Sequence, residues 1–276
     1  MRFRSHGAWP LALFAALALV PSAAAQDDAA RWLRNCERDH DDYGNHNTYC
    51  EVRNAGFRPS GQSLTVYPDQ NGGAELVGWD RDSVDVSIRI QGHGKTDSDA
   101  KDIVRQISVE ASGSNIRVSG PSSGHRQGWG VILYVRVPKK LDIKAETVNG
   151  PLSVEGVTGT MDLRAKNGPV SLSQVGGDVR AYVQNGPLTV ELSGTSWNGK
   201  GLDAEAVNGP LDLALPDNYN AELETGTVNG PYDIGVPLTV TLKGRTQDRI
   251  HSTLGKGGAP VRAVTTNGPL TIRRAS

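Results

Sequence analysis

Aromatic side chains are scarce in this chain of 276 residues, which contains three Phe, seven Tyr and five Trp. Large globular cores draw much of their buried volume from aromatic residues. A chain with so few of them is expected to have a thin interior filled by Ala, Val and Leu. This excludes a broad globular core and favours a narrow stack of strands.

Charge of one sign is also lacking. The chain has 29 Lys and Arg against 30 Asp and Glu, and no cluster of basic residues occurs. Domains that bind nucleic acids usually gather Lys and Arg on one face. We therefore expect no nucleic-acid partner.

A pronounced apolar run occurs only near the N-terminus, at residues 11–20, after Arg2 and Arg4 and before Ala23-x-Ala25. A basic start, an apolar run and small residues before a cleavage point are typical of a secretory signal peptide. A membrane anchor is the alternative, but the run is far shorter than the roughly 20 residues of a spanning helix. We predict a signal peptide at 1–25, and a mature chain with no integral membrane segment that resides in the periplasm, outside the cell or at its surface.

The chain has two cysteines, Cys36 and Cys50. In an oxidising compartment, two cysteines this close in sequence predict a disulfide, with free thiols as the alternative. Closing a loop of about 15 residues would stabilise the fold by roughly 3 kcal/mol in the chain-entropy model.

A tripeptide, Asn-Gly-Pro, recurs every eighteen to twenty-odd residues through the second half of the chain. Its six copies are Asn149-Gly150-Pro151, Asn167-Gly168-Pro169, Asn185-Gly186-Pro187, Asn208-Gly209-Pro210, Asn229-Gly230-Pro231 and Asn267-Gly268-Pro269. Counted from each Asn, positions +3 and +5 are apolar (Leu152 and Val154 in the first copy) and +4 is polar. Positions −6 and −4 are mostly apolar too (Ile143, Ala145). Alternation with period two predicts one strand before and one strand after each tripeptide.

The proline argues against a hairpin between these two strands. In a two-residue Asn-Gly hairpin the next residue donates its N–H across the turn, and proline has none. Asn-Gly-Pro therefore predicts an open corner from which the chain continues to a new strand. A repeat of this length predicts an all-β fold, a β-solenoid or β-helix of roughly 18-residue rungs.

Position −5 is charged in every copy. In chain order it holds Lys144, Asp162, Arg180, Asp203, Glu224 and Arg262. If rungs stack in chain order, these signs favour neighbours at every step except Asp203 to Glu224. The last step, over 38 residues, is uncertain in register. Stacked corner residues, from Asn149 to Asn229, are also expected to form an amide ladder.

The ends of such a stack expose strand edges that need covering. We expect residues 26–60, clipped by the disulfide and starting with a helix, to cap the N-terminal end of a solenoid domain at 61–276. Capping residues ahead of Ile103 predict a further short helix after Thr96. Arg273 and Arg274 are expected to discourage further stacking at the far end.

Two motifs suggest chemistry but lack the context for it. Gly120-Pro121-Ser122-Ser123-Gly124 fits G-x-S-x-G, yet no helix is predicted after it, as a nucleophile elbow requires. A loop at 39–46 holds Asp39, His40, Asp41, Asp42 and His46, groups that can bind Zn²⁺, but their spacing fits no defined site. We therefore predict no metal and no cofactor, and interpret the loop as solvated surface.

Two faces could carry function instead. Asp212 and Asp233 both occupy position +4, so stacking in chain order would place them side by side, as an acid/base pair requires. Two exposed acidic residues are the simpler interpretation. The other +4 positions are Ser and Thr, which form either a flat recognition face or an ordinary exposed strand.

Several longer passages resemble a known bacterial family. They are LVGWDRDSVDVSI (76–88), DSDAKDIVRQISVE (97–110) and LYVRVPKKLDIKAETVNGPLSVEGVTG (133–159). Together with the Asn-Gly repeats they resemble an adhesin-like β-strand-repeat family, a domain of unknown function, over Gly61 to Ser276. Many relatives have Asp or Ser where this chain has Pro at the corner, and the segment with the two cysteines lies outside the pattern.

The resemblance implies a β-solenoid with an adhesive or envelope role and supplies no catalytic residues. We therefore expect an exported, non-enzymatic interaction or structural module. Its partner would be an envelope or extracellular protein or a polysaccharide. The alternative is a carbohydrate-active β-helix enzyme, a polysaccharide lyase or glycoside hydrolase.

Overall fold

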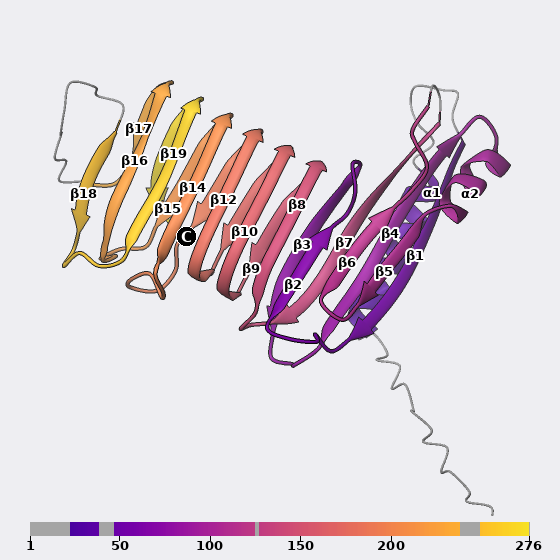
Figure 1. Cartoon of the computed structure of the whole chain (residues 1–276). Helices are drawn as coiled ribbons and strands as arrows, with labels where there is room; N and C mark the ends of the chain where they lie inside the picture. The colour runs from indigo at the N-terminus through magenta and orange to yellow at the C-terminus, as the bar shows by residue number, and fades with distance from the viewer. Residues whose placement is uncertain (1–22, 39–46, 125–126, 238–248, 276) are drawn as a thin grey trace, which may run out of the picture.

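The computed structural model describes residues 23–38, 47–124, 127–237 and 249–275. Most of them belong to two ten-stranded sheets that face each other along an elongated stack (Figure 1). In spatial order, sheet A consists of β1 (Asn47–Phe57), β4 (Val84–Gly94), β7 (Gly128–Pro138), β3 (Gly72–Trp79), β9 (Leu152–Glu155), β11 (Val170–Ser173), β13 (Leu188–Glu191), β15 (Leu211–Leu215), β20 (Leu270–Arg274) and β17 (Tyr232–Ile234). Neither sheet closes on itself.

Sheet B runs from the opposite end of the stack. Its order is β18 (Ile250–Leu254), β16 (Ala221–Asn229), β19 (Pro260–Asn267), β14 (Gly201–Asn208), β12 (Gly176–Asn185), β10 (Thr158–Asn167), β8 (Asp142–Asn149), β2 (Ser63–Tyr67), β6 (Asn115–Ser119) and β5 (Ser108–Ser112). The two helices, α1 (Ala23–Arg38) and α2 (Asp97–Arg105), lie at the N-terminal end of the stack (Figure 1).

Each repeat unit contributes one strand to sheet B and, after its corner, one strand to sheet A. Strands β8, β10 and β12 pair in parallel at an offset of one repeat, so that Asn149, Asn167 and Asn185 are register partners. The strands on either side of Pro169, β10 and β11, lie in different sheets and do not pair. The predicted open corner is therefore confirmed, and the stack is solenoid-like.

Hydrogen bonding between units continues through the corners. The Gly150 N–H donates to the Asn167 carbonyl at 3.1 Å, and the Leu152 N–H donates to the Pro169 carbonyl at 2.9 Å. The same two bonds recur at each later step of the stack. Proline therefore removes a donor at a point where the ladder needs only an acceptor, and its fixed φ stiffens the bend.

The corner glycines form a column in close backbone contact. A Cβ on Gly168 would overlap the carbonyl oxygen of Gly150, and one on Gly186 would overlap that of Gly168. Asn71-Gly72-Gly73 continues this column beyond Gly150, because Ala74 pairs with Leu152 in sheet A. A weaker copy of the corner thus begins the stack before the six Asn-Gly-Pro copies.

The core lies between the sheets and is narrow and aliphatic. Positions −6, −4, +3 and +5 of the repeat point inward, and Ile143, Ala145, Leu152 and Val154 are each at most 2% exposed. The exceptions are Tyr232 and Ile234, which are 38% and 37% exposed on the edge strand β17. They keep the apolar pattern but have a neighbouring strand on one side only.

The units do not stack in chain order at the C-terminal end. Strand β19 pairs with β14 on one side and β16 on the other, and β20 likewise lies between β15 and β17. The last unit of the chain is therefore inserted between the two units that precede it (Figure 1). Our expectation that the units stack in chain order is wrong here.

The insertion also corrects the role predicted for Arg273 and Arg274. Both residues belong to β20, which is an interior strand of sheet A, so they do not mark the end of the stack. Arg273 pairs with Asp212 at 3.0 Å and Arg274 with Asp217 at 3.4 Å. At this end sheet B terminates with β18, which runs antiparallel to β16.

The N-terminal end is built from antiparallel strands and helices. Strand β1 pairs antiparallel with β4 and is the edge strand of sheet A. The predicted helix after Thr96 is confirmed as α2, whose capping box joins Thr96 and Asp99 and whose Ile103 and Val104 are buried. Within the described residues, no helix is both long and apolar enough to span a membrane.

Candidate functional site

The outer face of sheet B carries a column of alternating charges, which we call the charge ladder. In spatial order it contains Lys144, Asp162, Arg180, Asp203, Arg262 and Glu224, each in register with the next. Neighbouring strands lie about 4.8 Å apart. Because the last unit is inserted, Arg262 separates Asp203 from Glu224. The single unfavourable step expected from chain order is thereby removed, and the signs alternate throughout.

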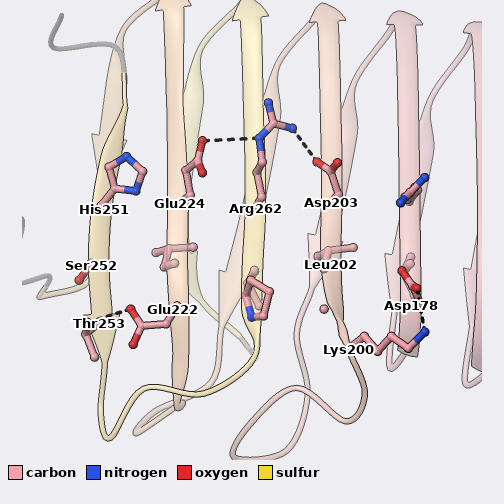
Figure 2. Close-up of a pocket in the computed structure, with 16 residues that line it drawn as sticks. Asp178, Lys200, Leu202, Asp203, Glu222, Glu224, His251, Ser252, Thr253 and Arg262 are labelled. Atoms are coloured by element: carbon pink, nitrogen blue, oxygen red, sulfur yellow. Dashed lines mark hydrogen bonds and ion pairs between the residues drawn. The ribbon is translucent and has the colours of Figure 1, made fainter. Parts of the chain in front are cut away.

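Arg262 gathers three carboxylates at one end of this ladder, and Figure 2 shows two of them, Asp203 and Glu224. Its Nη1 donates to Asp203 at 2.6 Å and to Glu205 at 3.2 Å, and its Nε lies 3.5 Å from Glu224. Burial disfavours the charged guanidinium, but the carboxylates of Asp203 and Glu205 outweigh it, so that the pKa of Arg262 is raised. The cluster fixes the relative positions of β14, β19 and β16 by charge-assisted bonds.

Two adjoining grooves follow this face across the strands. The first, of about 600 Å³, crosses β12, β14, β19, β16 and β18 and is lined by Asp178, Lys200, Glu222 and His251 among others (Figure 2). The second, of about 510 Å³, crosses β8, β10, β12 and β14. Both include Arg180 and Asp203, so the two grooves form one shallow trough along sheet B.

Tyr182 lies in the second groove and is 41% exposed. It occupies position −3 of its unit, with Arg164 of β10 as its register partner on one side and Glu205 of β14 on the other. Arg164 bonds Asp162 of its own strand at 3.0 Å, and Glu205 bonds Arg262. The Tyr182 ring is thus exposed to solvent between Arg164 and Glu205, which already form ion pairs within the protein.

On the opposite side of the stack, position +4 forms a column on the outer face of sheet A. Its spatial order is Ser153, Ser171, Thr189, Asp212, Thr271 and Asp233. Thr271 lies between Asp212 and Asp233, so the two carboxylates are not neighbours as chain order predicted. Asp212 is held instead by Arg273. The acid/base pair considered from the sequence does not form in this arrangement.

The corner asparagines form a continuous side-chain ladder. Each donates its Nδ2–H to the Oδ1 of the preceding neighbour, at 2.8–2.9 Å, along the series Asn149, Asn167, Asn185, Asn208, Asn267 and Asn229. The predicted amide ladder is confirmed, with Asn267 inserted before Asn229. Donors and acceptors all point the same way, so each interior residue makes two bonds.

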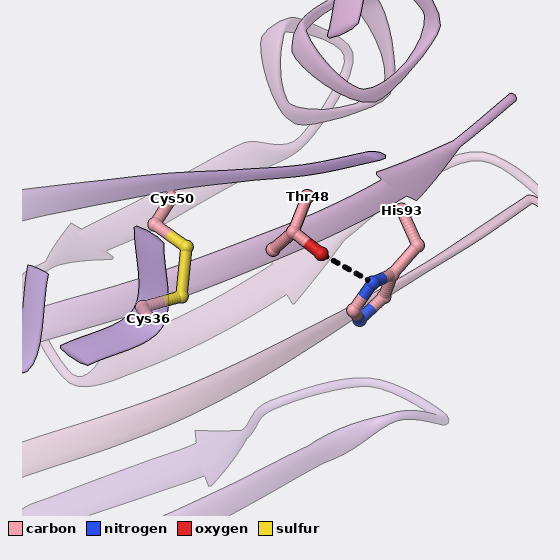
Figure 3. Close-up of a disulfide and its surroundings, with 4 residues drawn as sticks. All are labelled: Cys36, Thr48, Cys50 and His93. Carbon is pink, nitrogen blue, oxygen red and sulfur yellow. Dashed lines mark hydrogen bonds between the residues drawn. A yellow bond between two sulfur atoms is a disulfide. The ribbon is translucent and has the colours of Figure 1, made fainter. Parts of the chain in front are cut away.

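The disulfide between Cys36 and Cys50 joins α1 to β1 (Figure 3). Nearby, Thr48 Oγ1 lies 3.2 Å from Nδ1 of His93 on the neighbouring strand β4. Helix α1 is held further by Arg89 of β4, whose guanidinium bonds Asp28 and stacks 3.9 Å from the Tyr134 ring centroid. These contacts anchor the N-terminal helix to sheet A.

Two further candidates from the sequence add no chemistry to this site. Residues 120–124 follow β6 and precede β7, so the G-x-S-x-G match lacks the strand–turn–helix setting of a nucleophile elbow. The acidic loop at 39–46 lies outside the described residues. Among the described residues, no group of three or more His, Cys, Asp or Glu side chains could hold a metal ion.

Sequence reasoning did not single out Tyr182. The period-two pattern places position −3 on the same outward face as the charge at −5, which was sufficient to mark an aromatic residue there as unusual. The flanking of Tyr182 by Arg164 and Glu205 follows from the register of the stack. The involvement of Arg262 required the insertion of β19, which the repeat alone did not reveal.

Residues 80–273 match the family described as Toastrack DUF4097. The chain belongs to this family. The match confirms the resemblance to an adhesin-like family of unknown function, carried by the Gly-Trp-Asp passage and the Asn-Gly repeats. No curated protein matches the chain.

Three solved structures illustrate what the Toastrack chain is similar to. A "putative cell adhesion protein" from Clostridium sporogenes is 10% identical with a TM-score of 0.40, over 83% of this chain and 100% of that one. A "putative adhesin" from Bacteroides fragilis is 14% identical with a TM-score of 0.36, over 82% and 97%. A "putative lipid binding protein" from Parabacteroides distasonis is 11% identical with a TM-score of 0.31, over 84% and 98%.

Proposed function

We propose that this Toastrack chain is an exported, non-enzymatic recognition module of the bacterial envelope, and that the outer face of sheet B is its recognition surface. The observation that carries the proposal is the trough across β8 to β18, lined by alternating charges and an exposed aromatic ring. Its partner is an envelope or extracellular protein or polysaccharide, acting in the periplasm or at the cell surface.

The stack is suited to recognition because its surface groups are held in place before any partner arrives. Parallel, in-register strands set the spacing of the side chains, and the ion pairs around Arg262 fix their orientation. A surface that is ordered beforehand loses little side-chain entropy on binding. We interpret the whole as a β-solenoid of roughly 18-residue rungs, whose long regular face fits an extended partner.

The separation of Asp212 from Asp233 supports a non-enzymatic role. The carbohydrate-active alternative, a polysaccharide lyase or glycoside hydrolase, drew its acid/base pair from these two residues. Asp203, Glu205 and Glu224 do lie close together, but all three face the Arg262 guanidinium. Pairing with this one cation accounts for the closeness of the three carboxylates, and no acid/base role is needed to explain it.

Export is supported by the signal-peptide pattern at residues 1–25 and by the disulfide, which suits an oxidising compartment. The test is to express the full chain in a bacterium, fractionate the cells and determine the N-terminus by mass spectrometry. We expect a mature protein that starts at Gln26 in the periplasm or medium. An uncleaved chain retained in the cytoplasm would overturn the export part of the proposal.

Recognition is tested with the mature protein on immobilised envelope polysaccharide and protein fractions. Paired variants alter one face each, Arg180→Ser with Tyr182→Ser on sheet B, and Ser171→Ala with Thr189→Ala on sheet A. We expect retention that only the sheet B variant loses. Retention lost only with the sheet A variant, or none on any fraction, would overturn the assignment. Release of reducing ends that disappears in Asp212→Asn would favour the enzyme instead.

A further inference from the structure

We infer that the second groove binds an acidic sugar unit of an anionic polysaccharide, with the sugar ring on Tyr182 and its carboxylate at Arg180. This inference rests on the proposed function, because it assigns a ligand to the same outer face of sheet B. It commits to one polymer class, in which a carboxylate-bearing sugar recurs along an extended chain.

Tyr182 differs from the other exposed apolar and aromatic side chains in its position along the stack. Four large apolar or aromatic side chains are exposed among the described residues: Tyr182, Val228, Tyr232 and Ile234. The last three belong to the unit at the end of the stack, whereas Tyr182 lies in the middle of sheet B with paired strands on both sides. Its ring offers a flat apolar surface with a polar hydroxyl at the edge. The C–H face of a sugar ring fits such a surface.

The charged side chains around the Tyr182 ring differ in whether the protein already pairs them. Asp162 is engaged by Arg164, and Asp203 and Glu205 are engaged by Arg262. The hydrogen bond and the charge of Asp162 raise the pKa of the Arg164 guanidinium. The charge of Glu146, the register partner of Arg164 on β8, raises this pKa further.

Besides Arg164, the cationic side chains that line the second groove are Arg180 and Lys166. Within the described residues neither makes an ion pair, and both line the groove beside Tyr182. Carboxylates of the ligand would therefore find cations that no carboxylate of the protein already holds, Arg180 on one side of the ring and Lys166 on the other. Charge-assisted bonds of this kind are stronger than those between neutral groups, and a guanidinium can hold a carboxylate through two bonds at once.

Cations recur at alternate positions along the charge ladder. Lys144 and Arg180 are both cationic and lie two strands apart on the charge ladder, a separation of about 9.6 Å at the usual strand spacing. This separation is similar to the length of a disaccharide. In a polymer that crosses the strands, acidic sugars at every second position would therefore lie near Lys144 and Arg180 in turn. The trough continues past Arg180 toward Arg262, which leaves room for further units.

A polysaccharide fits this surface better than the other macromolecules. A protein interface has a buried apolar centre, and the groove offers a single aromatic ring surrounded by charged and amide groups such as Gln184. A nucleic acid would face Asp162, Asp203 and Glu205 with a phosphate backbone. Sugar hydroxyls can donate to these carboxylates while the sugar carboxylate is held by Arg180.

The experiment measures binding of the mature protein to polygalacturonate, alginate and hyaluronate by titration calorimetry. Methyl-esterified polygalacturonate serves as the matched neutral polymer, because it keeps the sugar rings and loses the charge. We expect binding to at least one acidic polymer, weakened as ionic strength rises. Where polygalacturonate is that polymer, its ester should bind about tenfold more weakly, since one charge-assisted bond is worth roughly 1.5–3 kcal/mol.

Variants then separate the contribution of the Tyr182 ring to binding from that of Arg180. Tyr182→Ala should weaken binding about tenfold, by analogy with the loss of one aromatic stacking contact, whereas Tyr182→Phe stays within about twofold. Arg180→Gln should weaken binding and reduce its dependence on salt. Thr189→Ala is the control, because Thr189 lies in the same unit on the opposite face and should leave binding unchanged. Unaltered melting temperatures exclude unfolding as the cause.

The outcomes distinguish this inference from the proposed function. Failure of all three acidic polymers to bind, equal binding of the ester, or wild-type affinity in Tyr182→Ala would each overturn the assignment of an acidic sugar. If envelope proteins still bound through sheet B in that case, the recognition role would stand and its ligand would be a protein. Loss of retention on every envelope fraction would instead overturn the recognition role itself.

Discussion

Asn267 donates its side-chain amide to Asn208 at 2.8 Å, across 59 residues of sequence. In the sequence, a complete unit with its own corner at Asn229 lies between these two residues. In the ladder, however, Asn229 follows Asn267 and donates to it. The chain thus leaves a gap of one unit, reverses through β18, and fills the gap with its last two strands.

Removal of residues 260–276 tests this topology. Without β19 and β20, strands β16 to β18 lose the unit that joins them to β14 and β15. Because each unit of a repeat array contacts mainly its neighbours, we expect β16 and β18 to lose protection in hydrogen–deuterium exchange while β8 and β10 retain it. Unchanged protection at β16 and β18, or loss at β8 as well, would contradict the expectation.

Gly186→Ala tests the corner column. The new Cβ would overlap the Gly168 carbonyl, and the backbone at Gly186 has a φ of 148°, which disfavours other residues. We expect a loss of about 3 kcal/mol in the free energy of unfolding, as for overpacking at a rigid site. Gly61→Ala is the control, since a Cβ there meets nothing within 4 Å, and it should change stability by less than about 0.5 kcal/mol. Urea denaturation measures both, and equal effects would refute the column.

The asparagine ladder predicts a difference between interior and terminal positions. Asn185 donates to Asn167 and accepts from Asn208, whereas Asn149 only accepts from Asn167. At about 0.5–1 kcal/mol per exposed bond, Asn185→Ala should cost about 1–2 kcal/mol and Asn149→Ala about half as much. Asn185→Asp should cost more than the alanine, because a carboxylate oxygen in place of Nδ2 would face the Asn167 Oδ1, with one acceptor repelling the other. Equal melting temperatures for all three variants would argue against the ladder as a source of stability.

The contact between Asp28 and Arg89 predicts acid release of α1. The bond from Arg89 holds the pKa of Asp28 below its ordinary value of 3.8. A lowered folded-state pKa stabilises the helix contact fully above about pH 4, and this contribution is lost as pH falls through the folded value. Trp32, whose ring lies 5.9 Å from the Arg89 guanidinium, reports the release by fluorescence. Asp28→Asn should remove the acid transition, whereas Asp102→Asn, in an exposed pair on α2, should keep it.

Much of the candidate site follows from the alternating pattern alone. Period two assigns Arg180 and Tyr182 to the same outward face, and the repeat length places Arg164 beside Tyr182. The ion pairs of Arg262 do not follow in this way, because each side chain reaches across strands whose order the pattern leaves open. The charges did contain a hint, since chain order alone gives an unfavourable contact between Asp203 and Glu224.

The sequence by itself determined the local structure: strands from alternation, corners from Asn-Gly-Pro, and the division into inward and outward side chains. These features depend on a few neighbouring residues and on backbone sterics. Only the tertiary structure decided which unit lies beside which. Every unit presents nearly the same edge to its neighbours, so several stacking orders satisfy the pattern equally well. The choice was made by long-range pairing, which placed Arg262 between two acidic residues and Asn267 within the amide ladder.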